Sequence, residues 1–178
     1  QTNKYLMEQL NFHNKKNNIL NFPLIVIGEE LRTPQNVGMG IRISEAFGVK
    51  KFYLNNNSPN TENRIVKRTA RNTNKNINIA YYDDILSLIS ILKKEGYSIL
   101  SLEITNRSKN IQDYNFTKHQ KIALLIGSER FGIDPKALDC CDQSIHIPMF
   151  GKNASMNVIN SLSVGLFEIT KQITKQSH

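Results

Sequence analysis

The chain has 178 residues, of which 39% are hydrophobic, so it can form one domain of ordinary size with a substantial core. It carries 23 Lys and Arg residues against 15 Asp and Glu residues, and the formal charge of +8 favours a polyanion such as nucleic acid as partner. No run of about 18 apolar residues is present and the first residues are polar. We therefore expect no transmembrane helix, no signal peptide and no membrane partner, and a cytoplasmic location.

Residues 1–21 are predicted to form an N-terminal helical extension, because Leu6 and Leu10 lie one helical turn apart. Residues 22–178 show no break in composition and are predicted to form a single domain. Short apolar runs predict strands at 24–27, 51–54, 98–102, 121–126 and 144–147, with a weaker strand at 78–81. Helical patterns lie between them at 36–47, 62–72, 83–95 and 155–172.

The ends of these helices carry typical capping residues. Gly48 and Gly96 stand where helices are expected to end, and Asp83 and Ser155 stand where helices are expected to begin. The alternation of strands and helices predicts an α/β fold with a mostly parallel sheet flanked by helices. Ligands of such sheets bind beyond the carboxyl ends of the strands, so the loops that follow the strands are expected to carry the chemistry.

The first of these loops is Asn36-Val-Gly-Met-Gly-Ile-Arg42, which opens the helix after strand 24–27. Gly38 and Arg42 are four residues apart and share a helix face, so the glycine is expected to leave an open shelf where a nucleotide meets the guanidinium. Asn36 is expected to cap the helix or to bind a ligand. A capped helix with a surface arginine fits the same residues, and the spacing alone favours neither interpretation.

A dinucleotide-binding site is the obvious competitor for this loop. Ile43 stands where the third glycine of that fingerprint belongs, and the loop begins about ten residues after the strand. The next strand ends in Leu54-Asn55, with no acidic residue to bind a ribose. A nicotinamide or flavin cofactor is therefore disfavoured.

The second loop, Gly127-Ser-Glu-Arg-Phe-Gly132, follows strand 121–126. Gly127 is expected to let a ligand lie against the strand end, and Glu129 to place a carboxylate at the sheet edge that carries Arg42. A simple strand-to-helix turn would use the same residue types, so this loop alone decides little.

The third segment runs from Ile147-Pro-Met-Phe-Gly151 to Ser155-Met-Asn157 and leads into the last helix. Pro148 withholds one backbone donor and Gly151 permits an unusual turn, so backbone groups of this loop are free to bind a ligand. A capped core helix is the alternative interpretation.

In this order and with this separation, the three segments resemble the signature motifs of the SpoU (TrmH-type) family of RNA 2′-O-methyltransferases, which belongs to the SPOUT class. The family pattern is Asn-x-Gly-x-x-x-Arg, then Gly-x-Glu-x-x-Gly, then Ile-Pro-Met followed by Ser-Leu-Asn and a helix that ends near a Glu. The matching residues here are Asn36, Gly38, Arg42, Gly127, Glu129, Gly132, Ile147, Pro148, Met149, Ser155, Met156, Asn157 and Glu168. Met156 replaces the usual Leu, a swap that conserves side-chain volume.

The resemblance implies a SPOUT-type α/β knot, in which the C-terminal part threads a deep trefoil knot, and a homodimer whose active site lies between the subunits. It implies S-adenosyl-L-methionine as cofactor. The residues that the resemblance assigns to the cofactor are Leu102, Glu103, Gly127, Ile147, Met149, Ser155 and Met156. No metal is expected, since the histidines are scattered and the adjacent Cys140 and Cys141, expected to be reduced thiols, lack the spacing of a metal site.

The resemblance also implies that Arg42 takes part in catalysis. Because an arginine side chain hardly deprotonates, we expect Arg42 to stabilise the developing oxyanion and hold the adjacent phosphate rather than act as a base. The residues expected to orient Arg42 and the ribose are Asn36, Glu129, Ser155 and Asn157.

A run of basic residues is expected to face the RNA. It consists of Arg64, Lys67, Arg68, Arg71 and Lys75, with no acidic residue between them. The first four fall on one face of a helix, which predicts a phosphate-binding stripe, although charge runs are commonly only solvated surface. Lys4, Lys15 and Lys16 can extend the stripe.

These features together predict an S-adenosylmethionine-dependent RNA ribose 2′-O-methyltransferase. We expect tRNA rather than rRNA as substrate, because the length leaves no room for the additional N-terminal RNA-binding domain of many rRNA-modifying relatives. The alternatives are the same chemistry on rRNA and a catalytically silent RNA-binding homologue. Retention of Arg42, Glu129 and Asn157 argues against the silent homologue.

Overall fold

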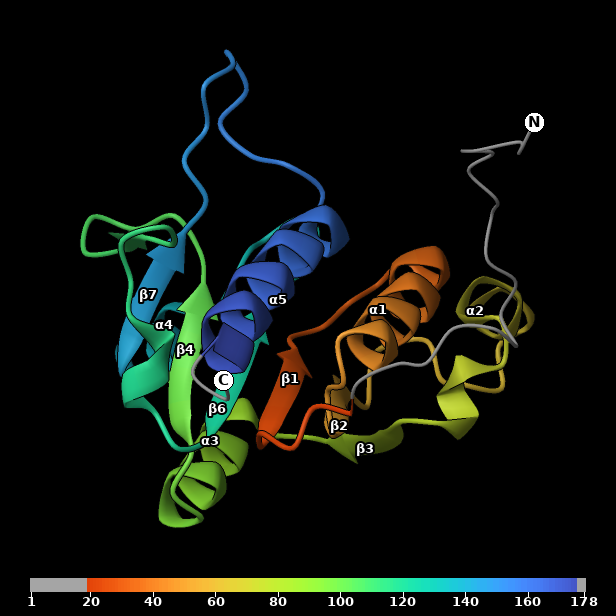
Figure 1. Cartoon of the computed structure of the whole chain (residues 1–178). Coiled ribbons are helices and arrows are strands. Elements are labelled where there is room, and N and C mark those ends of the chain that lie inside the picture. The colour runs from red at the N-terminus through yellow and green to blue at the C-terminus, as the bar shows by residue number, and fades with distance from the viewer. Residues whose placement is uncertain (1–18, 176–178) are drawn as a thin grey trace, which may run out of the picture.

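A computed structural model of the protein describes residues 19–175, which form one seven-stranded sheet with helices on both faces (Figure 1). The strands are β1 (Leu24–Gly28), β2 (Lys51–Asn55), β3 (Asn78–Tyr82), β4 (Ser98–Leu102), β5 (Lys109–Asn110), β6 (Ile122–Ile126) and β7 (Gln143–His146). The α-helices are α1 (Pro34–Ala46), α2 (Arg64–Ala70), α3 (Ile85–Lys94), α4 (Pro135–Asp139) and α5 (Val158–Lys175), and two 3₁₀ turns are η2 (Thr73–Lys75) and η3 (Phe116–Lys118).

The strands lie in the order β3-β2-β1-β6-β4-β7-β5, and every pairing between neighbours is parallel. Side chains of a strand alternate between the two faces of a sheet, and both faces are covered here. Leu24 and Val26 of β1 belong to the core cluster that α1 and α5 cover. Ile25 and Ile27 belong to the cluster that α3 and α4 cover. The predicted α/β class with a mostly parallel sheet is confirmed.

The six strands expected from the sequence are present, each within one residue of its predicted ends. Gly48 and Gly96 have φ angles of +73° and +86°, the left-handed conformation expected after a helix. The short strand β5 and the helix α4 were not predicted. The expected helix at Leu6 and Leu10 lies outside the described residues.

Two predicted helix caps are wrong by one or a few residues. Asp84, not Asp83, caps α3, since its carboxylate accepts a hydrogen bond from the backbone N–H of Ser87 at 2.7 Å. The last helix begins at Val158, and Asn157 rather than Ser155 accepts from the Ile159 backbone N–H at 2.8 Å. In both cases an Asx residue further along the chain lies closer to the first helical turn than the residue chosen from the sequence.

In the sheet, strands from the second half of the chain lie between strands that precede them in the sequence. β6 lies between β1 and β4, and β7 lies between β4 and β5, although β6 and β7 each follow both of their neighbours in the chain. The loops after β4, β6 and β7 therefore meet at one edge of the sheet, and the segment 147–157 rises from that edge in Figure 1. The trefoil knot implied by the resemblance stays a prediction.

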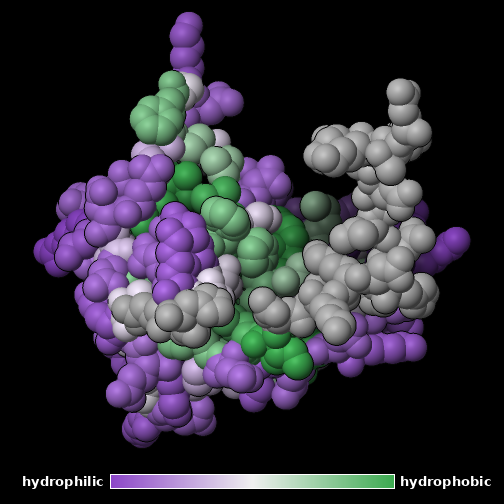
Figure 2. Space-filling model, viewed as in Figure 1, coloured by the Kyte–Doolittle hydropathy of each residue, from purple (hydrophilic) through white to green (hydrophobic). Residues whose placement is uncertain are grey.

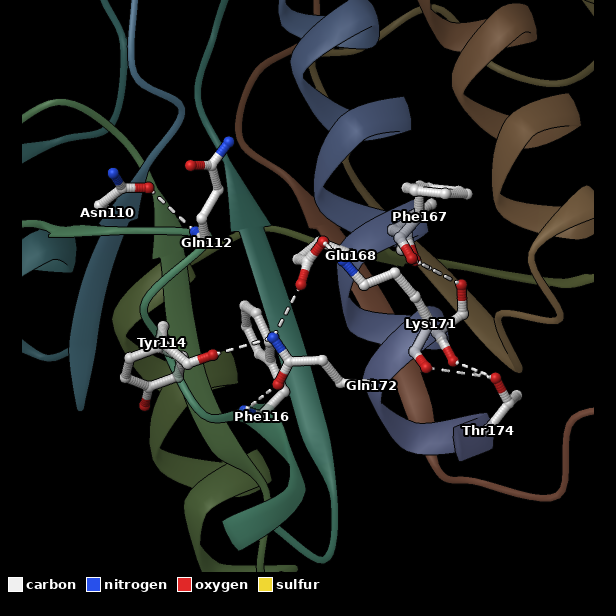
Figure 3. A network of polar contacts seen from close by, with 11 residues as sticks. Asn110, Gln112, Tyr114, Phe116, Phe167, Glu168, Lys171, Gln172 and Thr174 are labelled. Atoms are coloured by element: carbon white, nitrogen blue, oxygen red, sulfur yellow. Dashed lines mark hydrogen bonds and ion pairs between the residues drawn. The ribbon is translucent and has the colours of Figure 1, made fainter. Parts of the chain in front are cut away.

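The side chain of Gln172 forms hydrogen bonds that connect the C-terminal helix to the segment before β6 (Figure 3). Its Oε1 accepts from the backbone N–H of Phe116 at 3.0 Å, and its Nε2 donates to the Tyr114 carbonyl oxygen at 3.0 Å. Nε2 also donates to Glu168 Oε1 at 2.9 Å. Since Tyr114 and Phe116 are buried, Gln172 supplies partners that water cannot supply there. Among residues 19–175, no helix is long and apolar enough to cross a membrane.

Candidate functional site

A pocket of about 320 Å³ opens where the loops after β4, β6 and β7 meet the start of α5. Its volume lies at the lower end of the range of roughly 300–1,000 Å³ that is typical of small-molecule sites. The lining residues are Leu102, Glu103, Ile104, Ile126, Gly127, Ser128, Glu129, Arg130, Gly132, His146, Ile147, Met149, Ser155, Met156, Asn157, Val158 and Ser161. All seven residues assigned to the cofactor from the sequence are among them, so one pocket unites segments that lie far apart in the chain.

Gly127 was expected to let a ligand lie against the strand end, but its role in the structure is different. A Cβ at this position would lie 2.7 Å from the Gly132 carbonyl oxygen, closer than real Cβ atoms come to another backbone. The missing side chain therefore makes room for the loop itself, which folds back onto the strand end, and does not by itself make room for a ligand. Gly132 completes the turn with φ +67°, which a residue with a side chain rarely adopts.

The Glu129 carboxylate joins the second loop to the start of α1. It accepts hydrogen bonds from the backbone N–H groups of Arg32 and Thr33, both at 3.0 Å, and from Asn36 Nδ2 at 2.9 Å. The Thr33 side chain makes no capping hydrogen bond, so Glu129 provides the anion that a helix N-terminus favours. Burial opposes ionisation, but these hydrogen bonds outweigh it and hold the pKa of Glu129 below its usual value.

A second carboxylate, Glu29, connects the end of β1 with the start of α4. Glu29 follows β1 directly, is only 9% exposed, and accepts from the backbone N–H of Asp134 through both oxygens at 3.2 Å. Burial is the main reason that the pKa of Glu29 is raised to about 7, and the nearby charges of Asp134 and Glu30 raise it further. The sequence interpretation missed Glu29, whose only signal was an acidic residue at the end of a wholly apolar strand.

Asn36 and Asn157 extend this network to the last helix. Asn157 Nδ2 donates to Asn36 Oδ1 at 3.4 Å, while Asn157 Oδ1 caps α5. Asn36 thus does not cap its own helix but links Glu129 with Asn157. Ser155 lines the same pocket from the exposed loop before α5. Four of the five residues predicted to be catalytic therefore lie together.

Arg42 is the exception. It lies on α1 almost two turns after Asn36, is exposed, and is not among the residues that line the pocket. No hydrogen bond or ion pair of its side chain is found among residues 19–175. The expectation that the neighbouring polar residues orient Arg42 is therefore not met within one chain.

The expected open shelf beside Arg42 is also absent. A Cβ at Gly38 would collide with the Thr69 side chain and lie 2.7 Å from the Val66 carbonyl oxygen. Gly38 is buried because α2 packs closely against α1 at this position. The sequence pattern cannot distinguish a glycine that admits a ligand from one that admits a neighbouring helix.

The five residues of the predicted basic stripe are all at least partly exposed. The helix that carries these residues is shorter than expected, because α2 ends at Ala70 and Arg71 adopts a left-handed conformation with φ 50°. Lys67 pairs with Glu62 at 2.6 Å, just before the acid-free run. Arg64 and Arg68 therefore share the helix, while Arg71 and Lys75 extend the charge beyond its end.

Comparison with known proteins identifies the family. The family model described as "SpoU rRNA Methylase family" matches residues 23–167. The chain belongs to the SpoU family. A SpoU-type relative, the 23S rRNA (guanosine-2′-O-)-methyltransferase of Blochmanniella floridana, is 29% identical over 163 residues, which cover 92% of this chain and 62% of that protein. The tRNA (guanosine(18)-2′-O)-methyltransferase of Thermus thermophilus is 27% identical over 152 residues, which cover 85% of this chain and 76% of that protein.

Solved structures of SpoU-type proteins share the fold. The AdoMet-bound rRNA methyltransferase from Sinorhizobium meliloti superposes with a TM-score of 0.79 at 20% identity, over 85% of this chain and 57% of the other. At that identity the likeness establishes the fold. The chain thus has the SpoU fold and motifs, and it spans about three fifths of the length of the rRNA relative and three quarters of that of the tRNA relative.

The pocket suits the cofactor of the SpoU family. His146 lines the pocket, and its Nδ1 is buried without a hydrogen-bond partner among the described residues. The apolar residues Leu102, Ile126 and Val158 line the pocket together with the carboxylate-bearing Glu103 and Glu129. Such a mixture fits a ligand that combines a flat base with a charged tail.

Proposed function

We propose that the protein is an S-adenosylmethionine-dependent RNA ribose 2′-O-methyltransferase, and that the pocket after β4, β6 and β7 holds the cofactor. The observation that carries the proposal is that residues of the second and third motifs, together with the end of β4, line one pocket. Family membership adds that related proteins are named as ribose methyltransferases.

When bound, the cofactor supplies a methyl group on a sulfonium, which is activated for in-line displacement. The residues of the chain then have to place a ribose hydroxyl, not to generate a reactive group. Asn157 offers an amide group at the pocket, and Asn36, which Glu129 fixes, holds Asn157 from behind the pocket wall. We assign the stabilisation of the developing oxyanion and the adjacent phosphate to Arg42, whose planar fork suits both.

Since Arg42 does not line the pocket of its own chain, we propose that a second copy brings it there. The side of α1 and α5 that faces solvent exposes Met39, Val164 and Phe167, and Figure 2 shows apolar surface where these two helices lie side by side. An exposed apolar face of this kind favours a protein–protein contact. A homodimer that buries it, as the resemblance implies, would place Arg42 of one subunit near the pocket of the other.

The substrate we propose is tRNA. At similar sequence identity, this chain matches a larger share of the tRNA-modifying relative, 76%, than of the rRNA-modifying relative, 62%. Arg64, Arg68, Arg71 and Lys75 lie at the surface without an acidic partner among the described residues and provide a surface for phosphates. Labelled methyl transfer to purified tRNA and rRNA fractions distinguishes the two substrates.

A calorimetric titration with S-adenosylhomocysteine tests the cofactor assignment. Ser155 lines the pocket from an exposed loop, so Ser155→Trp should block the pocket without disturbing the core, and binding should be lost. Lys152→Trp, in the same loop but not at the pocket wall, is the matched control and should bind normally. Equal binding by both variants, or none by the unaltered protein, would contradict the proposal.

A further inference from the structure

Phe131 is an exposed aromatic residue held in a fixed position at the rim of the pocket. Its side chain lies in the turn between β6 and α4, and the residue is 66% exposed. The turn is closed by hydrogen bonds between the backbones of Ser128 and Gly132 at 2.9 and 3.2 Å. The backbone N–H of Phe131 itself donates to Ser128 Oγ at 3.1 Å. A large apolar side chain is therefore held in solvent by a hydrogen-bonded turn rather than by a loose loop.

Two arginines from different loops flank this ring. The guanidinium carbons of Arg32 and Arg130 each lie 5.3 Å from the ring centroid of Phe131, within the range of a cation–π contact. The Arg32 backbone is fixed by its hydrogen bond to Glu129, and its side chain pairs with Glu30 at 3.0 Å. Arg130 lines the pocket. The Glu129 network thus fixes the Arg32 backbone beside the site, and Arg130 lies at the pocket wall next to the ring.

An exposed aromatic ring with two guanidinium groups 5.3 Å from its centroid fits one chemical partner particularly well. An unpaired nucleobase stacks on an aromatic face whatever its identity, and the phosphates on either side of it attract guanidinium groups. A folded protein segment would offer no comparable alternation of flat π faces and negative charges. The neighbouring Glu129 and Gly132 line the pocket, so a base stacked here would lie close to the nucleotide that is methylated.

We propose that Phe131, flanked by Arg32 and Arg130, is a stacking platform for an unpaired base of the RNA substrate next to the target nucleotide. This proposal rests on the proposed function and deepens it, because it requires the target to lie in a single-stranded loop or end. It also separates two contributions to RNA binding. The basic residues around α2 hold phosphates, whereas the platform holds one base.

The test uses the full chain and a short uridine-rich single-stranded RNA labelled with fluorescein. Because stacking tolerates any base, the probe need not be the natural substrate. Phe131→Ala should weaken binding by about 10-fold, Phe131→Leu by a similar factor, and Phe131→Tyr by little, since only the tyrosine keeps an aromatic face. Ile91→Ala removes an exposed apolar side chain from α3 and is the matched control, with unchanged affinity expected.

Two further measurements on the same variants separate the explanations. S-adenosylhomocysteine should bind the unaltered protein and all of its variants equally. If the unaltered protein did not bind it, the proposed function would be rejected. If every protein bound S-adenosylhomocysteine normally and RNA with the same affinity, only the platform would be rejected. If Phe131→Leu bound RNA as well as Phe131→Tyr does, stacking would be excluded. If Phe131→Ala lowered the mass measured by light scattering, Phe131 would belong to the contact between two copies, and the platform would be overturned.

Discussion

Glu129 Oε1 accepts a hydrogen bond from Asn36 Nδ2 at 2.9 Å, across 93 residues of sequence. The same carboxylate receives the backbone N–H groups of Arg32 and Thr33, and Asn36 in turn meets Asn157. Three motifs that are separate in the chain are therefore one hydrogen-bonded unit at the pocket. A change in this unit is expected to affect both the stability of the fold and the geometry of the site.

Glu129→Gln should test this unit directly. A glutamine keeps one acceptor but turns an NH₂ group toward backbone donors, so we expect a loss of about 1 kcal/mol in the free energy of unfolding, as the side chain is partly exposed. The folded pKa of Glu129 is depressed, so its contribution is present above the usual carboxyl value and is lost as the pH falls through the folded pKa. Urea unfolding at about pH 7 and about pH 3 should show a smaller difference between the two proteins at the lower pH.

Glu62→Gln is the matched control, since Glu62 is an exposed carboxylate that pairs with Lys67. It should change stability by well under about 1 kcal/mol at either pH. If Glu62→Gln and Glu129→Gln were equally destabilising, the hydrogen bonds of Glu129 would carry no special weight.

Glu29 should show the opposite dependence on pH. Its folded pKa is raised to about 7 from 4.5, so the ionised form destabilises the fold. Stability is unaffected below the unfolded pKa and falls as the pH rises from about 4.5 to about 7. Since one pKa unit corresponds to about 1.4 kcal/mol, the full effect is roughly 3 kcal/mol.

Glu29→Gln imitates the protonated side chain and keeps an acceptor for the Asp134 backbone N–H. It should be nearly neutral at about pH 4 and more stable than the unaltered protein at about pH 8, as measured by chemical unfolding at both values. A variant that is less stable at about pH 8 would show that the ionised carboxylate is needed.

Gln172→Ala should destabilise the attachment of α5. The change leaves the buried Phe116 backbone N–H and the Tyr114 carbonyl oxygen without partners, so we expect a loss of about 2 kcal/mol in the free energy of unfolding by urea. Thr174→Ala, on the same helix, removes a hydroxyl that bonds only carbonyl groups of its own helix and should cost about 0.5 kcal/mol or less. Similar losses for both would mean that Gln172 adds little beyond helix propensity.

Gly38→Ala should separate α1 from α2. Its Cβ would collide with the Thr69 side chain and approach the Val66 carbonyl oxygen, and overpacking of this kind costs about 1–3 kcal/mol. Gly151→Ala, where a Cβ meets no atom within 4 Å, should leave the melting temperature nearly unchanged. If Gly38→Ala instead impaired only RNA binding at full stability, the open shelf expected from the sequence would be the better interpretation.

The sequence predicted the sheet well because β1 and β6, at its centre, are runs of apolar residues that lead into a glycine, Gly28 or Gly127. It did not predict β5, since two residues form no periodic pattern, or α4, although Asp134 followed by Pro135 is a usual helix start. Short-range patterns also placed two caps on the wrong Asx or Ser residue.

The residues of the site that belong to the three sequence motifs could be predicted. The residues assigned to the cofactor line one pocket, because the ends of parallel strands meet at one edge. Glu29 and Phe131 were missed, since burial of a carboxylate and exposure of an aromatic ring depend on contacts between distant loops. Nor could spacing along one chain show that Arg42 lies away from the pocket.

The separation of Arg42 from the pocket predicts how its variants behave. Arg42→Ala should bind S-adenosylhomocysteine normally but lower methyl transfer by about 10²-fold or more, the loss expected for one preorganised oxyanion donor. Arg42→Lys should not restore activity, because an ammonium group cannot hold an oxyanion and a phosphate in one plane. Arg68→Ala combined with Arg71→Ala should instead weaken RNA binding and its salt dependence, with little change in turnover at saturating RNA.

The most direct measurement is mass spectrometry of nucleosides from RNA that the protein has treated with methyl-labelled S-adenosylmethionine. We expect the label on the ribose 2′-oxygen of one nucleotide with the unaltered protein, and about 10²-fold less label or lower still with Arg42→Ala. Label on a base, no label with protein that binds the cofactor, or an undiminished rate with Arg42→Ala would contradict this expectation.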